Sequence, residues 1–120
     1  PAVGNLIWIV SGGQVGEVAY DARASLGRAS SPIEDLAGGE AADNAAVARE
    51  VLAGGGSSAV RDAVALNVGA GILAWEGLDH PVSADTFEAR MRDAVGRAQA
   101  ALADGAGARL VERWAQASNS

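Results

Sequence analysis

The sequence of 120 residues contains no cysteine and no lysine, and both absences exclude classes of chemistry. Without cysteine there are no disulfides, no thiolate zinc site and no cysteine nucleophile. Without lysine there is neither a Schiff-base lysine nor the lysine of a P-loop. His80 is the only histidine, so a histidine-rich metal site is excluded as well.

Aromatic residues are also scarce, at 4% of the sequence, and alanine and glycine take their place. The length suits one compact domain rather than two. The formal net charge of −6 argues against nonspecific nucleic-acid binding, which requires a positive field. No apolar run approaches the roughly 20 residues of a membrane span. We therefore expect a protein that binds neither nucleic acid nor membrane, with the cytoplasm as its default location.

A β-hairpin is predicted for about residues 5–21. Leu6–Val10 is a β-branched and aromatic run, Ser11–Gly13 has the composition of a turn, and Val15–Tyr20 has that of a second strand. An isolated hairpin is marginally stable in water. We therefore expect these strands to extend a larger sheet.

Five helices, two of them short, are predicted after the hairpin. Ser31-Pro32-Ile33-Glu34 is a helix-start signature, in which Ser31 caps the helix and Glu34 closes a capping box. Glycine clusters end the first helices. The expected bounds are about 32–37, 40–53, 58–75, 84–104 and 108–117. Since two strands cannot complete the sheet that so apolar a helix layer requires, this order indicates part of a larger α/β domain.

The helices at 58–75 and 84–104 are predicted to form the core. The helix at 58–75 is apolar nearly all round, which indicates a buried, central helix. Its main stripe is Val60, Val64, Val68, Ile72 and Trp75. Gly69 and Gly71 each cost about 1 kcal/mol relative to alanine, and close approach of another element is the expected compensation. The inner face of the helix at 84–104 is predicted to consist of Phe87, Met91, Ala94, Val95, Ala98 and Leu102.

Two glycine clusters are candidates for a phosphate-binding loop. They are Gly38-Gly39-Glu40 and Gly54-Gly55-Gly56. Neither matches GxGxxG or GxxxxGK[ST] in a strand–loop–helix context. The preferred interpretation is that the glycines separate one helix from the next. The helix N-terminus after Gly39 can still hold an anion through its free amide groups.

The polar candidates are interpreted mainly as structural. His80 lies in a connector, which favours a surface residue over a catalytic base. Two roles are considered for the acidic residues Glu34, Asp35, Glu40 and Asp43. They could form a magnesium site. The commoner role is that of first-turn acids that complement the helix dipole. Arg61 and Asp62 mark the start of the helix at 58–75, and Asn67 is expected to tie its middle to a neighbouring loop. A solvated face without function is the interpretation of Glu88, Arg90, Arg92, Asp93 and Arg97. No catalytic, cofactor-binding or metal-ligating residue is predicted.

Two segments resemble motifs of anthranilate phosphoribosyltransferases. Glu34–Ala45 is similar to their (E)DL-x-GG-(D/E)-A-x-x-NA stretch, and Val60–Asn67 resembles their RDAVxLNAA helix. The separation through Val51–Gly54 fits that family, and Ile7–Val10 resembles the strand that precedes both motifs. Val68–Gly71 departs from the pattern, since alanines are commoner there. The ordered set extends over nearly the whole chain.

The resemblance implies that residues 1–120 are the C-terminal portion of a phosphoribosyltransferase α/β domain of the nucleoside-phosphorylase type. The parent enzyme would join anthranilate to phosphoribosyl pyrophosphate, with magnesium, in tryptophan biosynthesis. In that family the glycine-rich phosphoribosyl pyrophosphate loop and the acidic metal pair lie upstream of the strand matched by Ile7–Val10. Pro1, in place of an initiator methionine, suggests a processed or truncated product. We therefore expect this chain alone to be inactive and to bind no magnesium.

The expected partners follow from the same resemblance. They are the missing N-terminal portion of the enzyme and a second copy of the chain, in a homodimer or by self-association. Two alternatives are a non-enzymatic nucleic-acid-binding relative of the same fold and a free-standing interaction module. The acidic charge and the lack of lysine argue against the first alternative. A glycine-rich phosphate loop encoded upstream of Pro1 would support the transferase over both.

Overall fold

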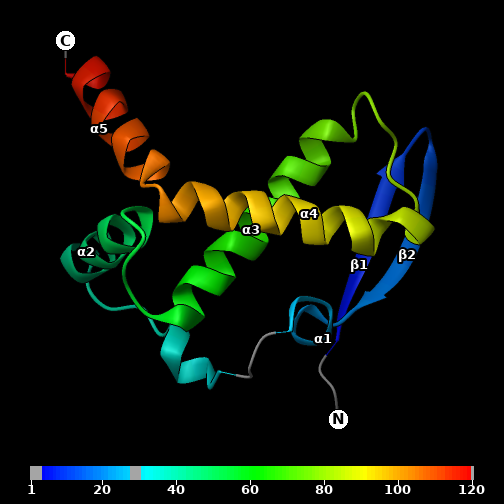
Figure 1. The fold of residues 1–120 in the computed structure, drawn as a ribbon, viewed down its shortest axis with the longest axis horizontal. Helices are drawn as coiled ribbons and strands as arrows, with labels where there is room; N and C mark the ends of the chain where they lie inside the picture. The colour runs from blue at the N-terminus through cyan, green and yellow to red at the C-terminus, as the bar shows by residue number, and fades with distance from the viewer. Residues whose placement is uncertain (1–3, 28–30, 120) are drawn as a thin grey trace.

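The computed structural model describes residues 4–27 and 31–119, and it shows a hairpin followed by helices (Figure 1). The elements are β1 (Asn5–Ser11), β2 (Gln14–Tyr20), α1 (Ala22–Leu26), the 3₁₀ helix η1 (Ile33–Leu36), α2 (Ala41–Leu52), α3 (Ser58–Glu76), α4 (Ala84–Ala103) and α5 (Ala106–Ser118). The expected α/β class is confirmed. Within the described ranges, no helix combines the length and the hydropathy needed to cross a bilayer.

β1 and β2 form the predicted antiparallel hairpin, with Ser11 paired to Gln14 beside the turn. Gly12 and Gly13 make the turn, with φ of 58° and 75°. A type I′ turn, whose twist matches that of the strands, has positive φ at both positions, and glycine adopts it without a Cβ penalty. The Gly-Gly pair therefore fixes the register of the whole hairpin.

One face of the hairpin packs on the helices. Ile7, Ile9 and Val18 lie against the buried core. Tyr20, at the end of β2, is 5% exposed and meets Phe87 of α4 edge to face, with the ring centroids 5.3 Å apart. This contact joins the sheet to α4, because edge-to-face aromatic pairs add to the stabilisation that burial already gives.

α3 and α4 cross and share the most extensive helix–helix contact among the described residues. The predicted inner face of α4 is confirmed. None of its members is more than 8% exposed: Phe87, Met91, Ala94, Val95, Ala98 and Leu102. The facing residues of α3 are Ala65, Gly69 and Leu73. The small residues Ala65 and Gly69 thus leave room for the larger side chains of α4.

Gly69 brings the two helices together. A Cβ at this position would lie 2.7 Å from Val95 Cγ2 and 3.0 Å from the Val95 backbone nitrogen. The predicted close approach is therefore confirmed at Gly69. It is wrong at Gly71, where an added Cβ would meet no other element of the described residues within 4 Å, because that position is on the far side of the helix from α4.

The prediction that α3 is a buried, central helix is wrong for this chain. From its predicted stripe, Val68 is 43% exposed and Trp75 is 76% exposed. Its buried residues are Ala65, Gly69 and Leu73, and Val60, Val64 and Leu66 are only partly buried against the core. Apolar character all round shows that a helix is suited to burial, but a second covering layer has to be supplied by other residues.

The start of the first predicted helix also differs from the expectation. It is a 3₁₀ helix capped by Pro32, and the structure records no side-chain cap hydrogen bond there. The capping box predicted for Ser31 and Glu34 is wrong, because with Pro32 as the cap Glu34 stands at the second helical position. A capping box requires the third.

Helix α1 is absent from the sequence-based prediction. Asp21 caps it through Oδ1, which accepts hydrogen bonds from the backbone nitrogens of Arg23 at 2.9 Å and Ala24 at 3.3 Å. Gly27 ends it in the left-handed region, with φ of 62°. A helix of five residues depends on its two caps rather than on a hydrophobic period, so the periodicity of the sequence does not reveal it.

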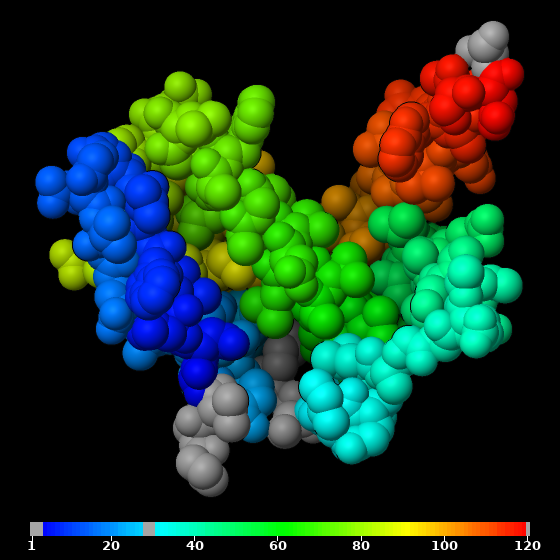
Figure 2. Space-filling view, turned by 180° about the vertical axis from the view of Figure 1, so that it is seen from behind, coloured from blue at the N-terminus to red at the C-terminus, as the bar shows by residue number. Residues whose placement is uncertain are grey.

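Helix α5 projects from the body and leaves a wide notch between itself and α3 (Figure 2). It begins after Gly105, which has a φ of 71° and redirects the chain from α4. The apolar residues of α5 are exposed, with Leu110 at 58%, Val111 at 41% and Trp114 at 73%. The last helix thus contributes little to the core of this chain.

Gly69→Ala should destabilise the fold, and Gly71→Ala should not. The added methyl group at Gly69 meets the backbone of Val95, so α3 and α4 must separate, at a cost of about 2 kcal/mol. At Gly71 the same change meets open space and gains helix propensity of up to about 1 kcal/mol. Urea unfolding followed by circular dichroism measures both free energies. Equal losses for the two variants would contradict the close crossing.

Candidate functional site

Asn44 holds the loop before α2 in place. Its Oδ1 accepts a hydrogen bond from the Gly39 backbone N–H at 2.9 Å, and its Nδ2 donates to the Gly39 carbonyl at 2.8 Å. A Cβ on Gly39 would lie 3.1 Å from Asp43 Oδ2, and one on Gly38 would lie 3.3 Å from Asn44 Oδ1. The two glycines and the asparagine of this motif are therefore parts of one structure, a loop folded back onto the first turn of α2.

This arrangement does not favour an anion at the N-terminus of α2. The Gly39 N–H is already bound by Asn44. Glu40 is the N-cap, and Asp43 places a second carboxylate in the first turn. These charges complement the helix dipole themselves and would repel an anionic ligand. The preferred interpretation, that Gly38-Gly39-Glu40 separates two helices, agrees with this geometry.

The four acidic candidates are not brought together as ligands. Glu34 and Asp35 lie in the first turn of η1, and Asp43 lies in the first turn of α2. In the part of the chain that the structure describes, no group of three or more histidine, aspartate or glutamate side chains is placed to hold a metal ion. The positions of Glu34, Asp35 and Asp43 match the first-turn role.

The second glycine cluster is held by Arg61. Its Nη1 donates to the Gly56 carbonyl at 2.8 Å and to the Gly55 carbonyl at 3.3 Å. A Cβ on Gly54 would lie 3.1 Å from the Leu102 carbonyl oxygen. Arg61 thus fastens the loop between α2 and α3, and the tight packing against α4 accounts for glycine at the first position.

Asn67 does not tie α3 to a neighbouring loop, contrary to the prediction. Its side chain is exposed, and Nδ2 donates to the Ala63 carbonyl at 2.8 Å within the same helix. Asparagine on an exposed helix face commonly satisfies itself by bonding a carbonyl one turn back. A contact between Asn67 and a neighbouring loop would require the Asn67 face of α3 to be buried, and in the structure Asn67 is exposed.

His80 lies on the surface, in the connector between α3 and α4. Its carbonyl accepts a hydrogen bond from Arg90 Nη1 at 2.7 Å, and its backbone N–H donates to the Glu76 carbonyl at 2.9 Å. Arg90 also donates to the Pro81 carbonyl at 3.2 Å. The surface interpretation of His80 agrees with this position. Arg90, interpreted as part of a solvated face, instead fastens the connector to α4.

Arg97 forms an ion pair with Glu76 at the end of α3, with Nη1 and Oε1 2.6 Å apart. The hydrogen bond from Arg97 lowers the pKa of the Glu76 carboxyl below its ordinary value. Both side chains remain partly exposed, at 52% and 36%, so solvent screens the pair. Arg97 therefore links the two crossing helices and is more than a solvated surface charge.

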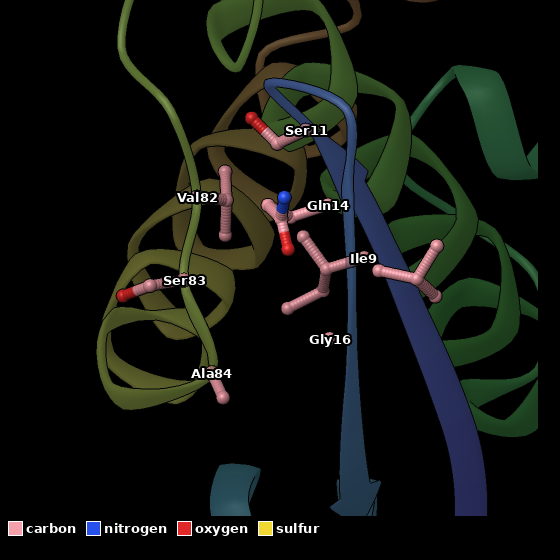
Figure 3. A pocket seen from close by; sticks show the side chains of 8 residues that line it. Ile9, Ser11, Gln14, Gly16, Val82, Ser83 and Ala84 are labelled. Carbon is pink, nitrogen blue, oxygen red and sulfur yellow. The ribbon is translucent and has the colours of Figure 1, made fainter.

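A depression of about 220 Å³ lies between the hairpin turn and the connector to α4 (Figure 3). It is lined by Ile9, Ser11, Gln14, Val15, Gly16, Val82, Ser83 and Ala84. None of these side chains is ionisable, and the Ser83 hydroxyl lies 3.1 Å from the Thr86 hydroxyl in the capping box of α4. The depression offers no general acid, base or metal ligand. It arises from tertiary packing, so no sequence signal could have revealed it.

Comparison with protein families matches residues 1–108 to the glycosyl transferase family, a/b domain. Among curated proteins, an anthranilate phosphoribosyltransferase of Nocardia farcinica is 42% identical over 116 residues, which are 94% of this chain and 32% of that protein. Proteins of the same name from Nocardioides sp. and Arthrobacter sp. are 43% and 40% identical, over 92% and 90% of this chain and 30% and 29% of their own lengths. The chain thus spans about a third of each relative. No solved structure matches it significantly.

Asn44→Ala should loosen the loop before α2. The variant loses both hydrogen bonds to Gly39, which are solvent-exposed and contribute about 1 kcal/mol together. The Gly39 amide should then exchange its proton faster, measured by hydrogen exchange with NMR detection. Glu40→Gln is the control, because the Glu40 side chain makes no cap hydrogen bond in the structure. We call the two hydrogen bonds between Asn44 and Gly39 the Asn44 clamp. An unchanged exchange rate of the Gly39 amide in Asn44→Ala would contradict it.

Arg97→Gln should raise the pKa of Glu76 towards the value of 4.5 for an unperturbed glutamate. In the native protein the pKa of Glu76 is lowered, so the ion pair stabilises the fold above pH 4.5, and this stabilisation is lost as the pH falls through the lowered pKa. Carboxyl ¹³C NMR titration measures the shift. Arg113→Gln, on α5, serves as the control and should leave the Glu76 titration unchanged.

Proposed function

This chain belongs to the glycosyl transferase family, through an a/b domain match over residues 1–108, and we propose that it is the C-terminal portion of an anthranilate phosphoribosyltransferase. The whole enzyme would transfer the phosphoribosyl group of phosphoribosyl pyrophosphate to anthranilate, a step of tryptophan biosynthesis, in the cytoplasm. The main support for this proposal is a sequence identity of 40–43% to three such enzymes over at least 90% of this chain.

The geometry supports a structural role for this portion rather than a chemical one. Stabilising a departing pyrophosphate needs preorganised donors and a metal ion. The depression beside the hairpin has no charged lining residue, and the acids Glu34, Asp35 and Asp43 sit at helix starts. Magnesium and both substrates would therefore bind residues of the enzyme outside this chain.

The two matched motifs gain a physical role under this proposal. The Asn44 clamp fixes the loop that precedes α2, and Arg61 fixes the loop that precedes α3. Together they set how α2 and α3 meet the end of α4. Motifs of this kind preserve the shape of a scaffold on which a site can be precisely positioned elsewhere.

The exposed apolar surface supports the remaining part of the enzyme as the partner. Large side chains from separate parts of the fold are exposed by more than half, among them Trp8, Trp75, Leu78 and Trp114. Tryptophan is enriched at interfaces, so three tryptophans exposed by more than half support contact with other parts of the enzyme. In isolation, self-association of the chain is part of the proposal for the same reason. The relatives favour the transferase over a nucleic-acid-binding protein of the same fold.

A chimera tests the proposed function. This chain would replace the 116 aligned residues of the Nocardia farcinica protein, and the chimera should consume anthranilate when phosphoribosyl pyrophosphate and magnesium are present. The chain alone should not. Loss of anthranilate fluorescence measures turnover, and a chimera with Gly69→Val, which clashes with Val95, is the matched control with reduced activity. A folded chimera without turnover, or turnover by the chain alone, would refute the proposal.

A further inference from the structure

The two strands of the hairpin differ in what they expose. On β1, Leu6 is 56% exposed, Trp8 67% and Val10 76%. The alternate residues Ile7 and Ile9 pack against the core, so β1 is apolar on both faces. Such a run is typical of a strand that is covered on both sides inside a sheet.

β2 has the composition of an edge strand. Glu17 stands at its centre, opposite Trp8, and Gln14 and Gly16 interrupt its apolar residues. A charged side chain on an exposed strand discourages further strand pairing, and glycine weakens a strand interior. The side of the sheet beyond β2 is therefore poorly suited to receive another strand.

The turn geometry determines which backbone groups of β1 remain available. With a two-residue turn, Ser11 and Gln14 form a hydrogen-bonded pair of the ladder, and such pairs alternate with pairs whose N–H and C=O groups point outward. Leu6, Trp8 and Val10 fall in the outward positions. The Trp8 indole donates to Glu17 Oε2 at 3.2 Å, as expected for the closer side-chain spacing of a pair of this second type.

The same three residues of β1 thus combine exposed apolar side chains with outward backbone groups. We propose that the free edge of β1 receives a further strand, and that this strand is an extended apolar segment of the enzyme from outside this chain. The inference rests on the proposed function. Two observations favour this occupant. Only two strands are found in the described residues. The aligned region is 28–32% of the length of relatives that share this domain, so most of each relative lies outside it.

Hydrogen exchange in the active chimera tests this edge. The Leu6, Trp8 and Val10 amides should exchange at least about tenfold more slowly in the chimera than in the isolated chain, because a new ladder protects them. The outward amides of β2, at Val15, Glu17 and Ala19, are the internal control and should exchange equally fast in both. NMR detection resolves each amide.

A pair of proline variants of the chimera adds an independent measurement. Val10 and Val15 face each other across the hairpin, and both amides point outward. Val10→Pro removes a donor from the proposed docking edge and should lower the chimera's activity at least about tenfold. Val15→Pro removes the matching donor from an edge strand, where proline is tolerated, and should retain activity.

The outcomes separate this inference from the proposed function. An active chimera in which the β1 amides stay unprotected, or in which only the β2 amides gain protection, overturns the docking edge and leaves the function standing. An inactive chimera with protected β1 amides overturns the function alone, and an inactive, unprotected one overturns both. Concentration-dependent protection of β1 in the isolated chain, with none added in the chimera, would assign the edge to a second copy and overturn the proposed occupant.

Discussion

The contact on which this structure depends is the crossing of α3 and α4 at Gly69. The backbone of Val95 approaches so closely that a Cβ at Gly69 would lie 3.0 Å from the Val95 nitrogen. Of the six buried residues of α4, Val95 meets α3 and Phe87 meets Tyr20 of the hairpin. The hairpin, α2 and α5 therefore take their positions from α4, and each of them contacts it or its immediate neighbours.

Polar side chains secure the connections around this crossing. Arg90 binds the connector between the two helices, Arg61 binds the loop before α3, and Asn44 binds the loop before α2. In each case a side chain satisfies backbone carbonyl groups that regular structure leaves unpaired. The family motifs of this chain are therefore concerned with the shape of its loops, and the geometry assigns no catalytic step to them.

Much of the fold is predictable from local pattern. The inner face of α4 can be identified in full, because a clear polar face opposes it, and Gly12-Gly13 indicates the hairpin turn. The failures have physical causes. Helix α1 rests on the Asp21 cap, which no hydrophobic period reveals. The burial of α3 is overestimated because its hydropathy shows that its side chains are suited to burial. It does not show whether other residues of the chain cover them. The Gly39–Asn44 clamp can be recognised as a motif, whereas its hydrogen bonds require the three-dimensional arrangement.

The crossing also has an evolutionary consequence. Position 69 has room for a hydrogen atom and little else, since Val95 Cγ2 would stand 2.7 Å from a Cβ. A smaller side chain at position 95 would remove that contact, but the nitrogen of residue 95 would still stand 3.0 Å from the Cβ. At this helix spacing the constraint therefore falls on position 69 alone. A family tree of this domain should keep glycine at 69 while the side chain 26 positions later varies in size.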